Sequence, residues 1–330
     1  MRPLVSVVVP VYDERENLEA LVARLHPVIE EQAGGAFEVL FVDDGSHDGS
    51  GEMLDAFNSR DPRYKVIHFS RNFGHQSALQ AGLDAARGLA VVMMDGDLQD
   101  PPELLVQFIE KWREGYDVVY AIRKTRRESL LKRAAYRTFY RTMKVVAEID
   151  TSLDVGDFCL MDGRVVAALV SLRERNRFLR GLRSWVGFRQ IGIEYERPAR
   201  HAGAPKYTVR KLIRLALSGY IGFSSLPLRA AAWLGMLFAA AGFGMAIWVI
   251  AEKIWGPTAP QGWASILSVV LIVGGIQLII LGVIGEYLGR VYDEIRRRPL
   301  YIVSSRVGVD PEMDERLMKI EAPSASQMDR

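Results

Sequence analysis

The first 125 residues alternate between short apolar runs and longer segments with helical periodicity. In the longer segments, apolar side chains recur at i, i+3, i+4 and i+7, as over residues 18–29, which is the spacing of a helix face that packs on a core. The short runs are rich in β-branched residues and have about five to seven positions each, the length of a buried parallel strand. They cover residues 5–11, 37–42, 65–69, 89–94 and 117–121. The alternation predicts an α/β fold with a mostly parallel sheet and helices on both of its faces.

Two long and almost uncharged stretches stand in the C-terminal third. Residues 230–251 and 264–287 are each long enough to cross a hydrocarbon core of about 30 Å as a helix. Arg229 precedes the first stretch and the arginines at 296–298 follow the second, so the positive-inside rule places both ends in the cytoplasm. We expect a two-helix transmembrane hairpin over residues 226–290; the alternative is a pair of buried helices in a soluble core.

The charges along the chain are unevenly distributed. The formal net charge is only +2, from 42 Lys and Arg against 40 Asp and Glu, but two strongly basic regions cover residues 123–144 and 173–214. A basic region favours a polyanionic partner, and the predicted hairpin makes an anionic membrane surface a better candidate than nucleic acid. Because no nucleic-acid recognition motif is visible, we expect no nucleic-acid partner.

Two segments within the basic regions combine cations with an apolar helical face. Residues 129–148 place Arg133, Arg137 and Arg141 beside an apolar stripe, and residues 207–223 repeat the pattern. We expect two interfacial amphipathic helices, with their apolar sides in the lipid; the alternative is surface helices of a soluble domain. The predicted organisation is a cytoplasmic domain over residues 1–225 that includes both helices, then the hairpin, then a cytoplasmic tail over residues 291–330.

Acidic residues follow three of the predicted strands. Glu14 comes after the first strand, Asp44 after the second, and Asp95 and Asp97, with Gln99, after the fourth. The carboxyl ends of parallel strands meet at one edge of a sheet, so these side chains should converge there. Such a cluster repels itself and needs a cation, and an Asp-x-Asp pair backed by an amide supplies the hard oxygen ligands that Mg²⁺ or Mn²⁺ binds together with phosphates and water.

Several other kinds of site are disfavoured. The chain lacks a Gly-x-Gly-x-x-Gly fingerprint after its first strand and also lacks a P-loop, which argues against a dinucleotide-binding dehydrogenase and a P-loop ATPase. The single cysteine, Cys159, excludes a disulfide framework, and the five histidines have no zinc-ligand spacing. One structural alternative concerns the fourth strand end, where Asp95 and Asp100 would only cap a helix that opens at Pro101.

These motifs resemble glycosyltransferase family 2, whose members have the GT-A fold, and within it the polyprenyl-phosphate glycosyltransferases such as dolichol-phosphate mannose synthases and bacterial undecaprenyl-phosphate sugar transferases. The resemblance runs from residue 5 to about residue 303. It implies a GT-A Rossmann-like fold for the cytoplasmic domain. The matching stretches are VSVVVPVYDERENL, FEVLFVDDGSHDGS, SRNFGHQSALQAGLDAARG, MMDGDLQDPPE, GDFCLMDGRVV and GEYLGRVYDEIRRRPLYIV.

The resemblance also implies roles for individual residues. Asp97 and Asp157 would be catalytic, with Asp157 as the family's proposed base on the acceptor side; the alternative for Asp157 is a loop aspartate that bonds its own backbone. The resemblance places Pro10, Tyr12, Glu14, Val42, Asp44, Asp95 and Gly96 in the nucleotide-sugar pocket. It gives Asp95, Asp97 and Gln99 to the metal, Mg²⁺ or Mn²⁺, and it gives Arg123, Arg200, Lys206 and Tyr207 to phosphate groups. Pro205 replaces the serine that is usual in the phosphate-binding motif, which removes one hydroxyl contact.

The reaction implied is the inverting transfer of a sugar from a nucleotide-sugar donor, which we expect to be UDP-linked, to a polyprenyl-phosphate lipid acceptor at the cytoplasmic side of a bacterial inner membrane. A phosphate monoester has its second pKa near about 6 and is already a nucleophile, so Asp157 is expected to orient it rather than remove a proton. A processive polysaccharide synthase is disfavoured because no Gln-x-x-Arg-Trp motif is present. A non-catalytic membrane partner with a degenerate domain, and a homo-oligomer formed through the Gly-rich second stretch, are left open.

Overall fold

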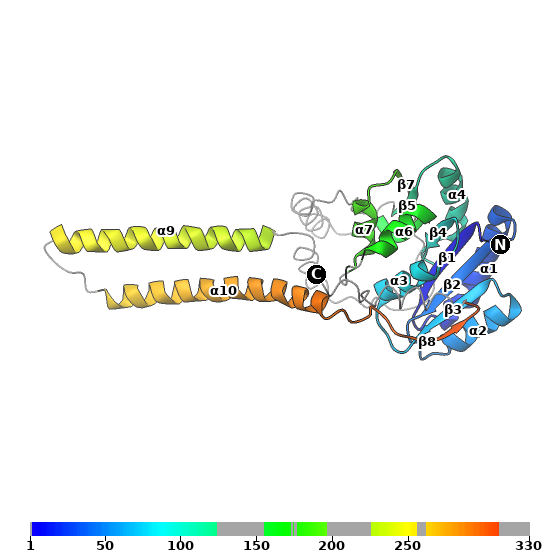
Figure 1. The fold of residues 1–330 in the computed structure, drawn as a ribbon, viewed down its shortest axis with the longest axis horizontal. Coiled ribbons are helices and arrows are strands. Elements are labelled where there is room, and N and C mark those ends of the chain that lie inside the picture. Colours follow the sequence, from blue (N-terminus) through cyan, green and yellow to red (C-terminus); the bar gives the residue numbers. More distant parts are fainter. Residues whose placement is uncertain are drawn as a thin grey trace, which may run out of the picture. The chain divides into compact units, whose positions relative to one another are not determined.

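The structure is a computed structural model and describes residues 2–123, 155–172, 174, 177–196, 226–255 and 262–309. The chain forms two compact units, which are described separately. The first unit draws on residues 1–133, 149–205 and 299–330 and contains a sheet with its helices; the second draws on residues 134–148 and 206–298 and contains two long helices (Figure 1).

The described part of the first unit contains one eight-stranded sheet with the strand order β7-β5-β6-β4-β1-β2-β3-β8. Its central strands β4, β1, β2 and β3 are parallel, as the alternating pattern predicts. The strands are β1 (Val5–Val11), β2 (Phe37–Asp43), β3 (Tyr64–Phe69), β4 (Ala90–Met93), β5 (Val118–Arg123), β6 (Val155–Asp162), β7 (Gln190–Tyr195) and β8 (Val303–Val307). The five predicted strands are all present, within a residue or two of their expected ends.

Helices cover both faces of this sheet (Figure 1). One layer contains α1 (Arg15–Ala33), α2 (Ser50–Arg60) and α4 (Leu105–Arg113), with the short 3-10 helix η1 (Pro102–Leu104) before α4; the other contains α3 (His75–Ala85), α6 (Gly163–Ser171) and α7 (Leu179–Trp185). Because side chains alternate along a strand, Val7 and Val9 of β1 pack with the first layer and Val8 packs with the second. Both faces of β1 are therefore buried, which is why its sequence, VSVVVPV, is almost entirely apolar.

The sheet is less uniformly parallel than the strand and helix pattern alone indicates. Strand β6 lies between β4 and β5 and runs antiparallel to both, so these two predicted strands are not neighbours in the sheet. The motif GDFCLMD, which the sequence marks only as a functional stretch, is this strand. Because β6 runs in the opposite direction, its first residues lie at the edge of the sheet where the parallel strands end. We call this edge the rim.

A strand also forms within the predicted C-terminal tail. β8 pairs antiparallel with the edge strand β3, and Tyr301, just before it, stacks on Phe69 with ring centroids 5.0 Å apart. The Tyr301 hydroxyl donates a hydrogen bond of 2.8 Å to Asp84 in α3. Residues 291–330 are therefore not simply a tail, because residues 303–307 complete the sheet.

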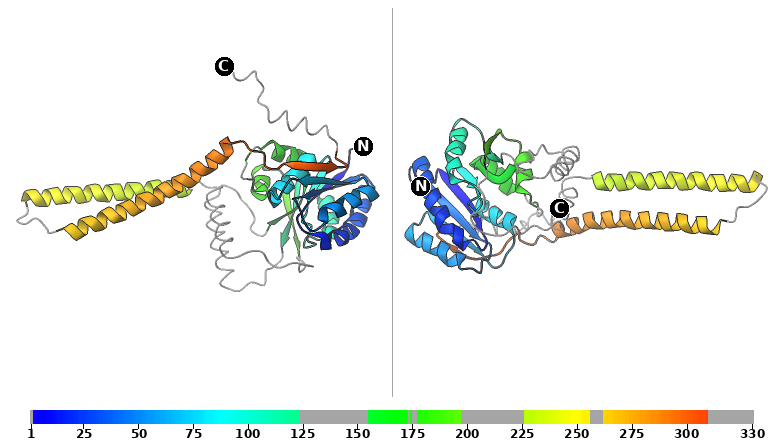
Figure 2. Two further views of the ribbon diagram at one scale, coloured as in Figure 1. Left: turned by 90° about the horizontal axis from the view of Figure 1, so that it is seen from below. Right: turned by 180° about the vertical axis from the view of Figure 1, so that it is seen from behind.

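The second unit contains two long helices that lie side by side, α9 (Leu226–Trp255) and α10 (Trp263–Ile295) (Figure 2). At 1.5 Å per residue, a 30-residue and a 33-residue helix extend about 45–50 Å, more than a hydrocarbon core requires. Their apolar side chains are largely exposed, with Trp233 at 70% and Leu278 at 71%. Exposed apolar surface of this extent marks a membrane or interaction surface.

Of the described helical segments, Ile272–Ile295 is long and apolar enough to cross a membrane, and Ala231–Met245 is a shorter apolar stretch. The hairpin and this helix suggest membrane association. Two crossings, at 230–251 and 264–287, remain a prediction. The expected interfacial helices over residues 129–148 and 207–223 lie outside the described residues.

Candidate active site

The strand order brings the acidic motifs to one rim of the sheet. Strands β4, β1 and β2 are parallel neighbours, so the residues that follow them leave the sheet at the same edge. Antiparallel β6 begins at this edge, and its register pairs Met93 with Cys159. Asp95, two residues beyond Met93, therefore comes level with Asp157, two residues before Cys159. The convergence expected from the sequence is found for these elements.

The ends of β1 and β2 form a closely hydrogen-bonded part of the rim. Pro10 pairs with Val42 in the ladder, and both are buried. The buried Asp44 carboxylate follows directly and accepts hydrogen bonds from the backbone N–H groups of Phe73 at 2.6 Å and Gly74 at 2.9 Å. Burial raises the pKa of Asp44, and the two N–H donors offset this only in part. The carboxylate is thus held in one orientation by the loop before α3.

The other two residues predicted near β1 differ in exposure and contacts. The side chain of Tyr12 is 38% exposed, so its ring is accessible beside the rim. Glu14 stands at the start of α1, where its carboxylate accepts a 2.6 Å hydrogen bond from the Asn17 amide. Its backbone N–H donates to Ser50 Oγ at the start of α2, which ties the two helix starts together. Tyr12 is therefore available to contact a ligand, whereas Glu14 has a clear role in holding the loop.

The turn after β4 directs alternate side chains outward. Asp95, Asp97 and Gln99 are partly exposed, and the residues between them, Gly96 and Leu98, are buried. Leu98 has a φ of +60°, a left-handed conformation that non-glycine residues rarely adopt, and Asp97 Oδ1 accepts the Gln99 backbone N–H at 3.1 Å. All three predicted metal ligands on this turn are therefore partly accessible from outside.

Asp100 fixes this turn from the inside. It is buried and accepts hydrogen bonds from the Asp95 backbone N–H at 3.2 Å and from the Tyr195 hydroxyl at 3.1 Å. It does not cap the following helix, because the N-cap of η1 is Pro101 and no side chain caps it. The capping alternative for Asp100 was therefore wrong, and its carboxylate stabilises the loop that presents Asp95 and Asp97.

The oxygen donors on this turn fit a divalent cation that also binds a ligand. In the described part of the chain, no group of three or more His, Cys, Asp or Glu side chains is arranged to hold a metal ion alone. Two carboxylates and an amide are an incomplete set for Mg²⁺ or Mn²⁺, which usually completes its coordination with substrate phosphates and water. The donors on the turn thus suit a metal that binds together with a diphosphate.

Asp157 is the most strongly held carboxylate of the rim. It is buried, and both of its oxygens accept hydrogen bonds of 2.8 Å from Arg180, Oδ1 from Nε and Oδ2 from Nη2. Burial by itself would raise the pKa of Asp157, but the hydrogen bonds and charges of Arg180 and His75 outweigh it and hold the pKa well below the usual range. The alternative of a loop aspartate that bonds its own backbone does not match this geometry, since Asp157 lies in β6.

Sequence reasoning missed two residues that lie at the centre of the rim. His75 begins α3, and its Nε2 lies 3.4 Å from Asp157 Oδ2 and 3.6 Å from Asp95 Oδ1. Burial lowers the pKa of His75, but Asp157 and Asp95 raise it by a larger amount, so its net shift is upward. His75 follows the third strand at the same sheet edge, and that position was an available signal. Arg180 is 23 residues from Asp157, and no local pattern indicates their pairing.

The predicted phosphate-binding residues are described only in part. Arg123 is the last residue of β5, but its side chain lies outside what the structure describes. Arg200, Lys206 and Tyr207 lie wholly outside the described residues. Their assignment to phosphate groups therefore stays a prediction.

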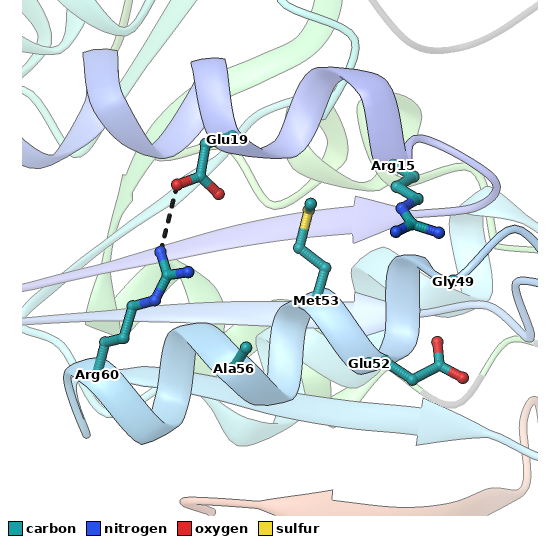
Figure 3. Close-up of a pocket in the computed structure, with 7 residues that line it drawn as sticks. All are labelled: Arg15, Glu19, Gly49, Glu52, Met53, Ala56 and Arg60. Atoms are coloured by element: carbon teal, nitrogen blue, oxygen red, sulfur yellow. Dashed lines mark hydrogen bonds and ion pairs between the residues drawn. The ribbon is translucent and has the colours of Figure 1, made fainter.

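A separate groove lies between α1 and α2. It has a volume of about 490 Å³ and is lined by Arg15, Glu19, Gly49, Glu52, Met53, Ala56 and Arg60 (Figure 3). Met53 points between the two helices, and Arg60 bridges to Glu19 at 3.2 Å (Figure 3). It contains none of the predicted site residues, so the rim remains the better candidate.

Comparison with known proteins identifies the family of this chain. Residues 6–169 match the family described as glycosyl transferase family 2, and residues 226–291 match the GtrB C-terminal hairpin. An uncharacterized glycosyltransferase of Bacillus subtilis (strain 168) is 46% identical to the chain, covering 92% of this chain and 94% of its own length. The chain belongs to glycosyltransferase family 2. The resemblance drawn from the motifs and the predicted fold class are confirmed, and the protein is a glycosyltransferase.

Other family 2 relatives have more specific names. A bactoprenol glucosyl transferase of Shigella phage SfX is 39% identical, covering 92% of this chain and 99% of the relative. A prophage bactoprenol glucosyl transferase homolog of Escherichia coli (strain K12) is also 39% identical, covering 91% of this chain and 98% of that protein. Among solved structures, a mannosyltransferase of Pyrobaculum calidifontis in complex with GDP-Man and Mn²⁺ is 17% identical, with a TM-score of 0.43, covering 97% of this chain and 80% of that one.

Proposed function

We propose that this glycosyltransferase moves a sugar from a nucleoside-diphosphate donor, UDP-linked, to polyprenyl phosphate, with inversion at the anomeric carbon. The observation that carries the proposal is the rim itself, where Asp44, the Asp95–Asp97 turn and Asp157 meet at one edge of the sheet. The named activity of the bactoprenol relatives supports the lipid acceptor. Attack by an acceptor phosphate oxygen forms the new glycosidic bond while the bond to the diphosphate breaks on the opposite face.

Each part of the rim has a role in this proposal. Asp44, fixed by two backbone N–H groups, accepts a hydrogen bond from the nucleotide base, and Tyr12 lies against the nucleotide. Asp95, Asp97 and Gln99 hold Mg²⁺ or Mn²⁺, which when bound offsets the negative charge that develops on the departing diphosphate. Arg123, Arg200, Lys206 and Tyr207 bind phosphate groups, since cations reduce the repulsion between two anions brought together.

In this proposal, Asp157 orients the acceptor side of the site and is not a base. A carboxylate that is ion-paired with Arg180 and whose pKa lies below the usual range has little tendency to take a proton. The acceptor phosphate does not need a base, because its second pKa is near about 6 and it is largely ionised at neutral pH.

We further infer that the chain acts at a bacterial inner membrane, with its catalytic unit in the cytoplasm. The hairpin match, the apolar stretch Ile272–Ile295 and the arginines that flank the hairpin support this placement. A lipid acceptor whose phosphate lies at the membrane surface requires an enzyme that stays at that surface.

The proposal is tested with purified protein, labelled UDP-sugars and undecaprenyl phosphate. Asp97→Asn should lower formation of chloroform-extractable label by about 100-fold or more, because it removes a charged ligand of the diphosphate-bound metal. Chelation with EDTA should abolish turnover in the wild-type protein, and Mg²⁺ or Mn²⁺ should restore it.

Glu19→Gln, in the groove between α1 and α2, is the matched control and should keep wild-type activity. Near-normal turnover of Asp97→Asn would rule out the metal assignment. Label in an insoluble polymer would instead indicate a processive synthase, and no turnover with any nucleotide sugar would indicate a non-catalytic partner.

A further inference from the structure

One imidazole nitrogen lies between carboxylates from two different parts of the rim. His75 Nε2 is 3.4 Å from Asp157 Oδ2 and 3.6 Å from Asp95 Oδ1. The three residues come from different elements: His75 begins α3, Asp157 lies in β6, and Asp95 follows β4. In the proposed function, Asp95 belongs to the donor diphosphate and Asp157 to the acceptor. His75 thus lies within 4 Å of a carboxylate of each group.

The two carboxylates differ in how firmly they are held. Asp157 is buried and receives two hydrogen bonds from Arg180. Gln76, the next residue of α3, lies 3.5 Å from Asp157 Oδ2 through its amide Nε2, and its Oε1 accepts the Leu179 backbone N–H at 3.2 Å. Contacts from α3 and α7 therefore fix Asp157, and with it the position of His75.

Asp95 stands in a more open environment. Its side chain is 28% exposed on the outer side of the turn, whereas that of Asp157 is 6% exposed. The turn is anchored through its backbone, where the Asp95 N–H donates to Asp100, and this contact does not orient the Asp95 carboxylate. Two carboxylates this close repel each other, and an N–H or a positive charge between them reduces that repulsion. His75 is placed to supply both.

We propose that His75 is a positioning residue that, held by Asp157, sets the Asp95 carboxylate in place for the metal-bound diphosphate of the donor. This inference rests on the proposed function, because it assigns Asp95 to the donor. The consequence is that Asp157, which the proposed function assigns to the acceptor, contributes to donor binding through the imidazole. Loss of His75 should therefore weaken binding of the donor nucleotide, whether or not a sugar is transferred.

The proposal is tested by calorimetric titration of the full-length protein in detergent with UDP in the presence of Mn²⁺. His75→Ala should raise the Kd about tenfold, or about 1.4 kcal/mol, because the Asp95 carboxylate loses the imidazole that lies 3.6 Å from it. His75→Gln carries an amide N–H near the position of Nε2 and should recover part of this loss. His75→Asn has the same amide, but its side chain is one methylene shorter, so it should bind as weakly as the alanine variant.

Comparison of His75→Gln with His75→Asn distinguishes a positioning role of His75 from a structural role at the start of α3. Asparagine is at least as favourable as glutamine near a helix N-terminus, so a purely structural role would make His75→Asn the better replacement. Thermal unfolding of each variant shows whether it is folded, and the comparison of Gln with Asn remains valid if the alanine variant does not fold.

A second measurement tests whether Asp157 affects UDP binding through His75. Asp157→Asn should itself weaken UDP binding, and adding His75→Ala should cause little further loss, because residues that act together are not additive. Equal UDP affinity for wild type and all three His75 variants would overturn the positioning role and leave the proposed function intact. Failure of the wild-type protein to bind either UDP or GDP with Mn²⁺ would overturn both.

Discussion

His68 lies between two carboxylates, one of which belongs to Asp43, the residue before Asp44. Its Nδ1 is 2.9 Å from Asp43 Oδ2, and its Nε2 is 3.0 Å from Asp55 Oδ1. A neutral imidazole has a single N–H and can donate to only one of these partners, whereas the imidazolium donates to both. The hydrogen bond to Asp43 raises the pKa of His68, burial opposes this, and the hydrogen bond to Asp55 adds to the rise.

This geometry predicts a loss of stability as the pH rises. The folded-state pKa of His68 is raised above its ordinary value of 6.5, so its contribution is complete below pH 6.5 and disappears as the pH passes the raised pKa. Thermal unfolding of the full-length protein in detergent should therefore show a decline over this range. His68→Gln should flatten the decline, and His47→Gln, at an exposed loop histidine, should leave it unchanged. The same slope in wild type and His68→Gln would contradict the assignment.

At the residue scale, the positions of the rim carboxylates were easier to predict from the sequence than their partners. Asp44, Asp95 and Asp97 follow apolar strands, and strand ends can be located from local patterns. His75 and Arg180 were missed because their importance comes from long-range pairing with Asp157, which β6 brings to the rim only through its antiparallel insertion. A single histidine is more often a packing residue than a catalytic one, so His75 by itself did not indicate a role in the site.

At the scale of the elements, the packing of α3 on the sheet depends on a very close contact with the central strand β1. A Cβ atom added to Gly82 would lie 2.1 Å from Cγ1 of Val8, which is fully buried. A side chain larger than hydrogen at this position must push α3 away from β1. Because α3 begins with His75, its position against the sheet also sets the position of the imidazole in the rim.

We predict that Gly82→Ala destabilises the protein by about 1–3 kcal/mol, the usual effect of overpacking a core. The measurement is the shift of the thermal unfolding midpoint. Val8→Ala removes the methyl groups that the new Cβ would meet, so the double variant Val8→Ala/Gly82→Ala should be more stable than the sum of the two single effects predicts. Strict additivity would show that the two positions do not meet.

At the element scale, the strands that the sequence located are the five apolar runs of the N-terminal region. The five N-terminal strands are apolar runs beside amphipathic helices and were located correctly. β8 reads VSSRV, five residues with little apolar character, and it acquires its partner β3 only through a contact that spans more than 230 residues of chain. Short polar edge strands of this kind carry no local signal, so the C-terminal boundary of the sheet could not be predicted.

At the scale of the whole molecule, the hairpin of α9 and α10 predicts a membrane topology that can be tested. If α9 and α10 each cross the bilayer, the segment between them is outside and the arginines after α10 are inside. The chain has one cysteine, Cys159, which is buried, so replacing it with serine gives a background without cysteine. In intact cells, a membrane-impermeant maleimide should then label Thr258→Cys but not Arg298→Cys. Labelling of neither position before cell lysis would show that the hairpin does not cross the membrane.

The first unit, which contains the rim, is discontinuous in sequence, because the chain returns to it after the hairpin and forms β8. The chain leaves this unit, builds both long helices, and comes back to contribute an outer strand before it ends. Cutting the gene before residue 226 would thus take away more than a membrane anchor. It would uncover the backbone N–H and C=O groups of β3, and a bare sheet margin of this kind promotes pairing between separate molecules. A soluble version of the enzyme is better made by replacing the hairpin with a short linker, so that residues 299–309 are retained.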